Sequence, residues 1–116
     1  MSDELSPIQV ELSPSFQRQL RKLAKRYRSI RKDLDSVTQQ LASGNFLGVQ
    51  VPGFEGTVYK IRVRNSDIQK GKSAGYRVIY YLKATDLIIL LAIYSKSDLA
   101  DMSVEEIRDI LAEFTE

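Results

Sequence analysis

The chain has 116 residues, of which 43% are hydrophobic and 28% are charged, and this composition predicts one soluble globular domain over residues 1–116. Cysteine and histidine are absent, which excludes disulfides, thiolate nucleophiles, histidine-bound metals and histidine-dependent catalytic triads. The formal net charge of +2 conceals an asymmetry, because residues 15–83 carry fifteen Lys and Arg against four acids, whereas residues 98–116 carry seven acids against one Arg. This uneven distribution of charge bears on which partners the protein binds and how fast it associates with them, and not on its fold.

Two features of the sequence bear on its location. The longest apolar run, residues 87–94 (LIILLAIY), is far shorter than the roughly 20 residues that a helix needs to cross a bilayer. The N-terminal segment MSDELSPIQ is acidic and lacks the apolar core of a signal peptide. We therefore expect a cytoplasmic protein with no membrane partner.

The first elements predicted along the chain are a short strand over residues 8–12 and two helices. Ser13 and Pro14 suit the cap and the first position of a helix, and Gly44 suits a left-handed stop after the second helix. The apolar positions of the two helices recur at helical spacing, and they are Phe16, Leu20, Leu23, Tyr27, Ile30, Leu34, Val37 and Leu41.

The outward face of the first predicted helix is almost purely basic. Its cations are Arg18, Arg21, Lys22, Lys25, Arg26 and Arg28. The interleaved Glu that usually balances such a face is missing. The pattern fits an ordinary solvated face and a partner-binding face equally well, and the sequence leaves both open.

The second half of the chain alternates strands and turns before a final helix. Strands are predicted over residues 58–64, 76–83 and 87–94, with a strand start and a turn over 45–54 and a polar loop over 65–75. The last strand is apolar on both faces, so we expect it to be central and buried. Ser103 and Glu106 form a capping box that opens a C-terminal helix. This order predicts an α+β fold, in which an N-terminal helical hairpin packs on an antiparallel sheet of about four strands.

The most informative stretch is the cationic strand over residues 58–64. Lys60, Arg62 and Arg64 alternate, so they share one face of the strand. Arg77 of the next strand shares a face with Tyr81, and we expect Arg77 to lie beside the other cations. Such a face can simply protect an edge strand from pairing with another chain. Cations that converge with tyrosines are also a recurring way of holding RNA, through phosphate contacts and base stacking.

Two other kinds of site are disfavoured by the sequence. Residues 70–73 (KGKS) end like a phosphate-binding loop, but Ser66 stands where the first glycine is required, and a strand rather than a helix follows. The acidic residues are scattered, with no spacing that would gather several of them near the cationic strand. We therefore expect no metal and no cofactor.

Four runs, YKIRVR, GKSAGYRVIYY, IILLAIYSKSD and DMSVEEIRDIL, resemble the RelE/ParE superfamily of toxins from bacterial type II toxin–antitoxin modules. The HigB-like branch, with its GKSGG loop, is the nearest match, and the resemblance extends from Ile8 to the C-terminus. It implies a RelE-like microbial RNase fold that enters the ribosomal A site and cuts mRNA during translation. It also implies a cognate antitoxin as partner, contact with ribosomal RNA, and contact with operator DNA only through the antitoxin.

The resemblance assigns roles to particular residues. The implied catalytic residues are Lys60, Arg62, Arg77, Tyr94 and Lys96. The implied RNA contacts are Arg64, Lys70 and Lys72, to which we add Tyr81 because it shares a face with Arg77. Ser97 stands where many relatives have an arginine, and Ser103 or its neighbours stand where many have a tyrosine, so we expect Tyr94 to substitute.

The predicted activity is that of a metal-independent endoribonuclease. Attack of the 2′-hydroxyl on the adjacent phosphate needs a base, charge neutralisation and a proton donor, and arginines can stabilise the developing charge. Lys60 is a candidate base, because neighbouring like charges favour the neutral amine, and Tyr94 or Lys96 can donate the proton. Two alternatives remain: a ParE-like inhibitor of DNA gyrase without nuclease chemistry, and a non-catalytic nucleic-acid-binding module.

Overall fold

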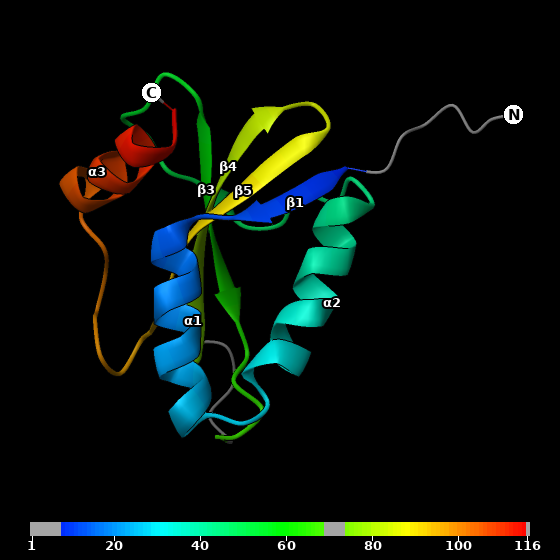
Figure 1. The fold of residues 1–116 in the computed structure, drawn as a ribbon, viewed down its shortest axis with the longest axis vertical. Helices are drawn as coiled ribbons and strands as arrows, with labels where there is room; N and C mark the ends of the chain where they lie inside the picture. Colours follow the sequence, from blue (N-terminus) through cyan, green and yellow to red (C-terminus); the bar gives the residue numbers. More distant parts are fainter. Residues whose placement is uncertain (1–7, 69–73, 116) are drawn as a thin grey trace, which may run out of the picture.

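The computed structural model describes residues 8–68 and 74–115, and within them it has an α+β fold (Figure 1). The elements in chain order are β1 (Gln9–Leu12), α1 (Pro14–Arg26), α2 (Ile30–Ala42), β2 (Val49–Gln50), β3 (Thr57–Val63), β4 (Tyr76–Ala84), β5 (Leu87–Ser95) and α3 (Val104–Thr115). The predicted order of elements is confirmed, although the strand start expected over residues 45–54 is reduced to the two residues of β2. No helix in the described part of the chain is long and apolar enough to span a membrane.

The strands form one sheet in the order β1-β5-β4-β3-β2. The predicted antiparallel sheet of about four strands is confirmed for β2 to β5. β1 adds a fifth strand that runs parallel to β5, with Gln9 opposite Leu87 and Leu12 opposite Leu90. No short turn connects β1 to β5, so its direction is set by the path through the helices and not by a hairpin.

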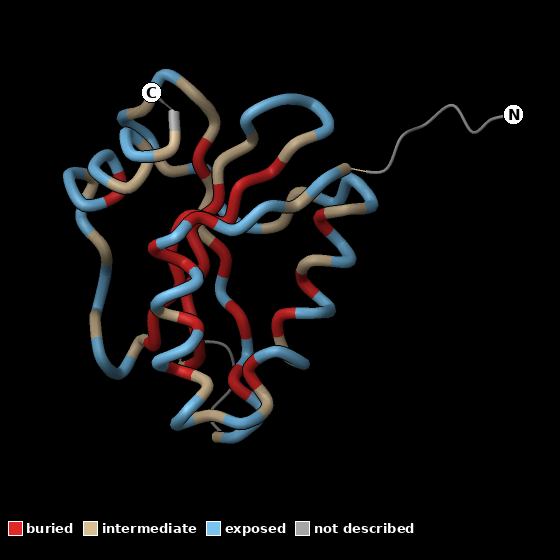
Figure 2. The backbone as a smooth tube through the Cα atoms, viewed as in Figure 1, coloured by how far each residue is buried: buried red, intermediate tan, exposed pale blue. Residues whose placement is uncertain are grey.

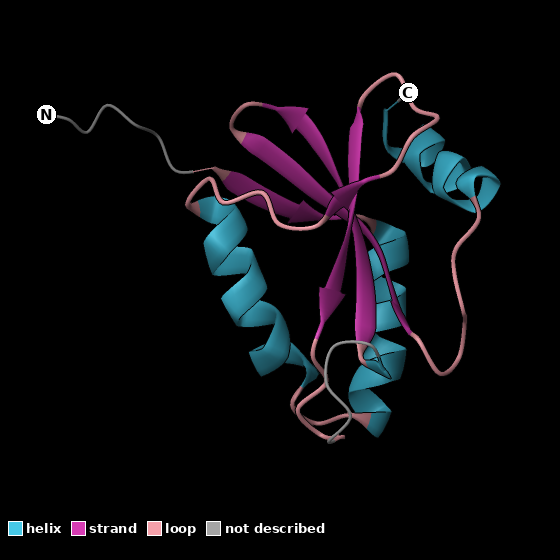
Figure 3. Cartoon of the chain, turned by 180° about the vertical axis from the view of Figure 1, so that it is seen from behind, coloured by secondary structure: helices cyan, strands magenta, loops and turns pink. Residues whose placement is uncertain are grey.

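Helices cover the sheet on both faces, and each face has its own core (Figures 2 and 3). α1 and α2 pack on one face through residues such as Phe16 and Leu34, and α3 packs on the other face through Ile107. β5 lies between β1 and β4 and is buried along nearly its whole length, which confirms the prediction of a central strand. This burial explains why both of its faces are apolar.

A bulge in β5 sets which side chains face α3. Ile79 pairs with Ala92 and Tyr80 pairs with Leu90, so Leu91 is an extra residue on β5. Leu91 and Ala92 both contribute to the core on the α3 side. Beyond the bulge the alternation resumes, and it brings Tyr94 to the α3 side as well.

The helix boundaries follow from local capping. The Ser13 hydroxyl accepts a hydrogen bond from the Phe16 N–H at 3.0 Å and donates one to the Leu91 carbonyl at 2.7 Å. Ser103 and Glu106 make the predicted reciprocal capping box, with hydrogen bonds of 3.0 and 3.1 Å. Gly44 has a φ of +92°, as expected for the stop after α2.

Candidate functional site

The register of the sheet brings the predicted site residues together. Arg62 on β3 lies directly opposite Arg77 on β4, and Arg77 lies opposite Tyr94 on β5. Lys60 is two residues from Arg62 on the same strand and therefore projects from the same face, towards the α3 side. We call Lys60, Arg62 and Arg77 the cationic cluster. Like charges directly opposite one another destabilise a sheet unless other contacts offset them.

The members of the cationic cluster differ in exposure. Arg77 is only 6% exposed, and its Nη1 donates a hydrogen bond to the Tyr76 carbonyl at 3.3 Å. Arg62 is exposed, and Lys60 is half-buried. Packing restricts the orientation of the buried guanidinium, whereas the exposed side chain of Arg62 is less constrained.

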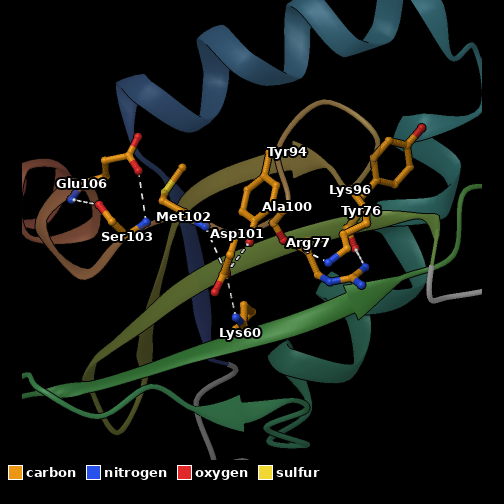
Figure 4. Close-up of polar contacts among 10 residues, drawn as sticks. All are labelled: Lys60, Tyr76, Arg77, Tyr94, Lys96, Ala100, Asp101, Met102, Ser103 and Glu106. Atoms are coloured by element: carbon orange, nitrogen blue, oxygen red, sulfur yellow. Dashed lines mark hydrogen bonds and ion pairs between the residues drawn. The ribbon is translucent and has the colours of Figure 1, made fainter.

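Asp101, which sequence analysis did not select, is the internal partner of Lys60. Its Oδ1 accepts hydrogen bonds from Lys60 Nζ at 2.8 Å, from the Tyr94 hydroxyl at 3.2 Å and from the Met102 N–H at 3.0 Å (Figure 4). The carboxylate therefore lies between a lysine of β3 and a tyrosine of β5. It belongs to the connection over residues 96–103, which leaves β5 at one end of the sheet and runs back to α3 (Figure 3).

These contacts fix the protonation states around Asp101. The hydrogen bond from Lys60 lowers the pKa of the Asp101 carboxyl below its usual range. Burial, together with the adjacent Asp101 carboxylate, raises the pKa of Tyr94 to about 12. At neutral pH the tyrosine is therefore a protonated hydroxyl. It is suited to donating a proton and unsuited to acting as a phenolate base.

The ion pair gives Lys60 a neighbour that sequence analysis did not expect. Sequence analysis placed only like charges beside this lysine and therefore treated it as a candidate base. The structure places the Asp101 carboxylate 2.8 Å from its ammonium group, so an anion lies beside the lysine as well as the two arginines.

An open hollow of about 1180 Å³ surrounds the outer edge of β3. β2 pairs with Tyr59 and Lys60, and the C-terminal part of β3 from Lys60 to Val63 borders this hollow. Its basic lining residues are Lys32, Lys60, Arg62, Arg64, Arg77 and Lys96. Five of these six were predicted as site residues, and Lys32 of α2 was not, because only tertiary packing brings it beside β3.

Lys96, just after β5, also lines the hollow. Its Nζ donates a hydrogen bond to the Ala100 carbonyl at 3.0 Å (Figure 4). This contact lies within the connection over residues 96–103, next to Asp101 in the sequence.

The structure does not gather all of the predicted residues. Tyr81 shares a sheet face with Arg77 but lies further along β4, where it lines a separate hollow of about 540 Å³ with Phe54 and Arg108. Lys70 and Lys72 lie outside the described residues.

Within residues 8–68 and 74–115, no three acidic side chains gather as a metal-binding group.

Comparison with known proteins gives a family match and a similar solved structure. The sequence profile of a family described as the ParE toxin of the type II toxin–antitoxin system parDE matches residues 10–100. No curated protein sequence matches the chain significantly. The chain is similar to the crystal structure of TrmO from Pseudomonas aeruginosa, with 23% sequence identity and a TM-score of 0.50. That match covers 81% of this chain but only 38% of the TrmO chain, and at this identity it concerns the fold alone.

Proposed function

This chain belongs to the ParE toxin family of type II toxin–antitoxin systems, and from that premise we propose that it is a ribosome-dependent mRNA endonuclease. The family implies an antitoxin partner. The proposal further includes a cytoplasmic site of action, entry into the ribosomal A site, and membership of the HigB-like branch. We also propose that operator DNA is contacted only through the antitoxin.

The observation that carries the proposal is the cross-strand pairing of Arg62 with Arg77, next to a protonated Tyr94. A phosphate held between two guanidinium groups accepts charge-assisted hydrogen bonds from both. Such a ligand would offset the repulsion that the register imposes on the two arginines. It would also place the scissile bond beside the Tyr94 hydroxyl.

The proposed reaction is transesterification within the RNA. The 2′-oxygen forms a bond to phosphorus and the bond from phosphorus to the 5′-oxygen breaks, which gives a 2′,3′-cyclic phosphate and a free 5′-hydroxyl. Arg62 and Arg77 neutralise the charge that develops on the phosphoryl oxygens. Tyr94 gives its proton to the leaving 5′-oxygen.

No side chain of the described site is well suited to accept the 2′-hydroxyl proton. The Lys60 ammonium is paired with a carboxylate, and the Asp101 carboxyl, with its lowered pKa, is a weak base. We therefore assign the acceptor to the ribosomal complex, which would also orient the substrate. This assignment predicts slow cleavage of naked RNA.

Gyrase inhibition is the second candidate, because the matched family is described by the name ParE. A gyrase-directed toxin needs no proton donor and no phosphate site. A non-catalytic nucleic-acid-binding module would keep the cations but would not need Tyr94. The two rivals therefore differ from the proposed nuclease in what Tyr94 and Arg77 should do.

A translation extract supplied with a defined mRNA tests the proposal. Primer extension should show cleavage at the A site with the unaltered chain, and this cleavage should be lost in Arg77→Ala and in Tyr94→Phe. Lys83→Ala, which removes an exposed cation near the end of β4, is the matched control and should retain cleavage. Gyrase-dependent DNA breakage with intact mRNA would overturn the proposal.

A further inference from the structure

The outward face of α1 is a second basic surface, distinct from the cationic cluster. α1 contains no acidic residue over its whole length. Four of its exposed cations, Arg18, Arg21, Lys22 and Lys25, form what we call the α1 basic face. Sequence analysis left open whether this face is only solvated or binds a partner.

The described contacts leave this face with a concentrated positive charge. Arg26, at the end of α1, pairs with Asp98 at 2.6 Å, but no acidic side chain within residues 8–68 and 74–115 pairs with the four cations of the α1 basic face. Arg18 and Lys22 are four residues apart, as are Arg21 and Lys25, and like charges at this spacing destabilise a helix. The sequence therefore retains an unfavourable arrangement that an anionic partner would relieve.

The spacing of these cations suits a regular row of phosphates. Arg18, Lys22 and Lys25 follow one stripe of the helix, and about 10 Å of helix axis separates the first from the last. A nucleic-acid strand advances about 3.4 Å per phosphate along its axis, so the stripe spans about three phosphates. An extended acidic segment presents carboxylates on one face only about every 6.6 Å, so it would offer fewer charges along the same stripe.

The α1 basic face lies on the other side of the sheet from the cationic cluster, and the start of α2 links it to the near edge of the hollow. α1 packs on the sheet face opposite to the one that carries Arg77, as Phe16 and Leu23 show. The exposed cations Arg31 and Lys32 begin α2, and Lys32 lines the hollow. Positive charge therefore continues from α1 around the open edge of β3.

We propose that the α1 basic face docks the sugar–phosphate backbone of a helical nucleic acid, without reading its sequence. The inference goes beyond the proposed cleavage and holds whether or not the cationic cluster acts on RNA. Backbone docking is driven largely by counterion release, so its affinity falls steeply with salt, by roughly one unit of logarithmic slope for each phosphate contact. The shared ligand chemistry is the phosphate row, which an RNA hairpin and a DNA duplex both present.

Fluorescence anisotropy with the full chain tests the inference, using a labelled RNA hairpin and a DNA duplex of the same sequence over a range of KCl concentrations. The paired substitution Arg18→Gln with Lys22→Gln should lower the magnitude of the salt slope by about 2 and weaken binding at least about tenfold at low salt. Gln is chosen because it keeps a high helix propensity. The charge-matched control, Lys83→Gln with Arg108→Gln, should leave the slope unchanged.

A second pair, Arg21→Gln with Lys25→Gln, keeps the test valid if the first pair lowers the thermal midpoint. Equal losses on both probes support docking of a generic backbone, and a loss on the RNA hairpin alone supports docking of RNA. Unchanged slopes in both pairs overturn the inference. A loss of binding to a polyglutamate peptide, with both nucleic acids unaffected, overturns it as well. Arg77→Ala should lose cleavage but keep the duplex slope, so failure of the proposed nuclease and failure of this docking surface are distinguishable.

Discussion

Asp101 brings a negative charge to the position where the proposed substrate would place its phosphate. Its carboxylate contacts Lys60 and Tyr94, two of the groups expected to face the scissile bond. The substrate must therefore compete with an internal anion. The side chain of Asp101 is 64% exposed, so this competition is modest rather than prohibitive.

Asp101→Asn should tighten binding of a short single-stranded RNA by about two- to fivefold, because exposed ion pairs contribute about 0.2–1 kcal/mol. The amide keeps a similar shape but removes the charge that opposes the phosphate. Titration of labelled RNA by anisotropy measures the change. Asp109→Asn, at an exposed position on α3, is the charge-matched control, and weaker binding in Asp101→Asn would contradict the competition.

Deprotonation of Tyr94 at alkaline pH should lower the stability of the fold. Its pKa is about 12 in the folded chain against 10.0 as its ordinary value, so the folded state holds this proton more tightly than the unfolded state does. The stability linked to this proton is fully present below about pH 10 and is lost as the pH rises towards 12. The loss amounts to about 3 kcal/mol, at ~1.4 kcal/mol for each unit of pKa.

Tyr94→Phe removes this titration and should therefore show a shallower fall in stability between pH 9 and 12, the pH range that spans the two pKa values. Urea unfolding at a series of pH values measures it. The unaltered chain supplies the reference slope, since its lysines and other tyrosines titrate in both proteins. Parallel curves for the two proteins would show that Tyr94 does not hold its proton as inferred.

Residues of the site differ in how far the sequence determines them. Lys60 and Arg62 share a face because a strand has a period of two, and the sequence is enough to predict this. The pairing of Arg62 with Arg77 depends on the register across β3 and β4, so only their proximity could be expected. The contact between Asp101 and Lys60 depends on the path of an irregular connection, which no periodicity describes.

Among whole elements, the helix boundaries could be predicted from the sequence, because the contacts that set them are local. The cap at Ser13 and the capping box at Ser103 lie within one helical turn of the residues that they bond, and both were predicted. The direction of β1 depends on its pairing with β5, which is distant in sequence, and β2 ends after two residues of pairing with β3. Those two features emerged only from the structure.

The pairing of β2 with β3 depends on a close backbone approach at Gly48. Its φ is +101°, and a Cβ at this position would lie 2.5 Å from the Lys60 carbonyl oxygen. Gly48→Ala should therefore be destabilising through backbone strain of about 1–2 kcal/mol and, in addition, through this collision. The substitution should also displace the strand that carries Lys60.

Gly44→Ala separates the two effects, because Gly44 has a similar φ of +92° but its Cβ would meet only the Ile8 side chain at 3.9 Å. Thermal unfolding of both variants provides the comparison. We expect the larger fall in melting temperature for Gly48→Ala. Equal falls would mean that the β2 to β3 approach tolerates a methyl group.

At the scale of the whole molecule, charge and packing are both unevenly divided. The α1 side is basic, whereas α3 is acidic, with Glu105 and Glu106 in its first turn. Among the described residues, the core under α1 and α2 contains fifteen buried residues, and the core under α3 contains seven. The smaller core supports the helix that follows the connection carrying Asp101, so docking of α3 and the position of Asp101 should be linked.

Ile107→Ala tests this link. Ile107 is 2% exposed and is the α3 residue fully buried in the smaller core, so its truncation should cost about 2–4 kcal/mol of α3 docking. Hydrogen exchange should accelerate in α3 and in residues 96–103 while the amides of α1 and α2 keep their protection, because the larger core does not contain Ile107. Ile110→Ala, the same change at a half-buried position of the same helix, should have a smaller effect. If exchange instead accelerated equally in all helices, the two cores would unfold as one unit, and the position of Asp101 would not depend separately on α3.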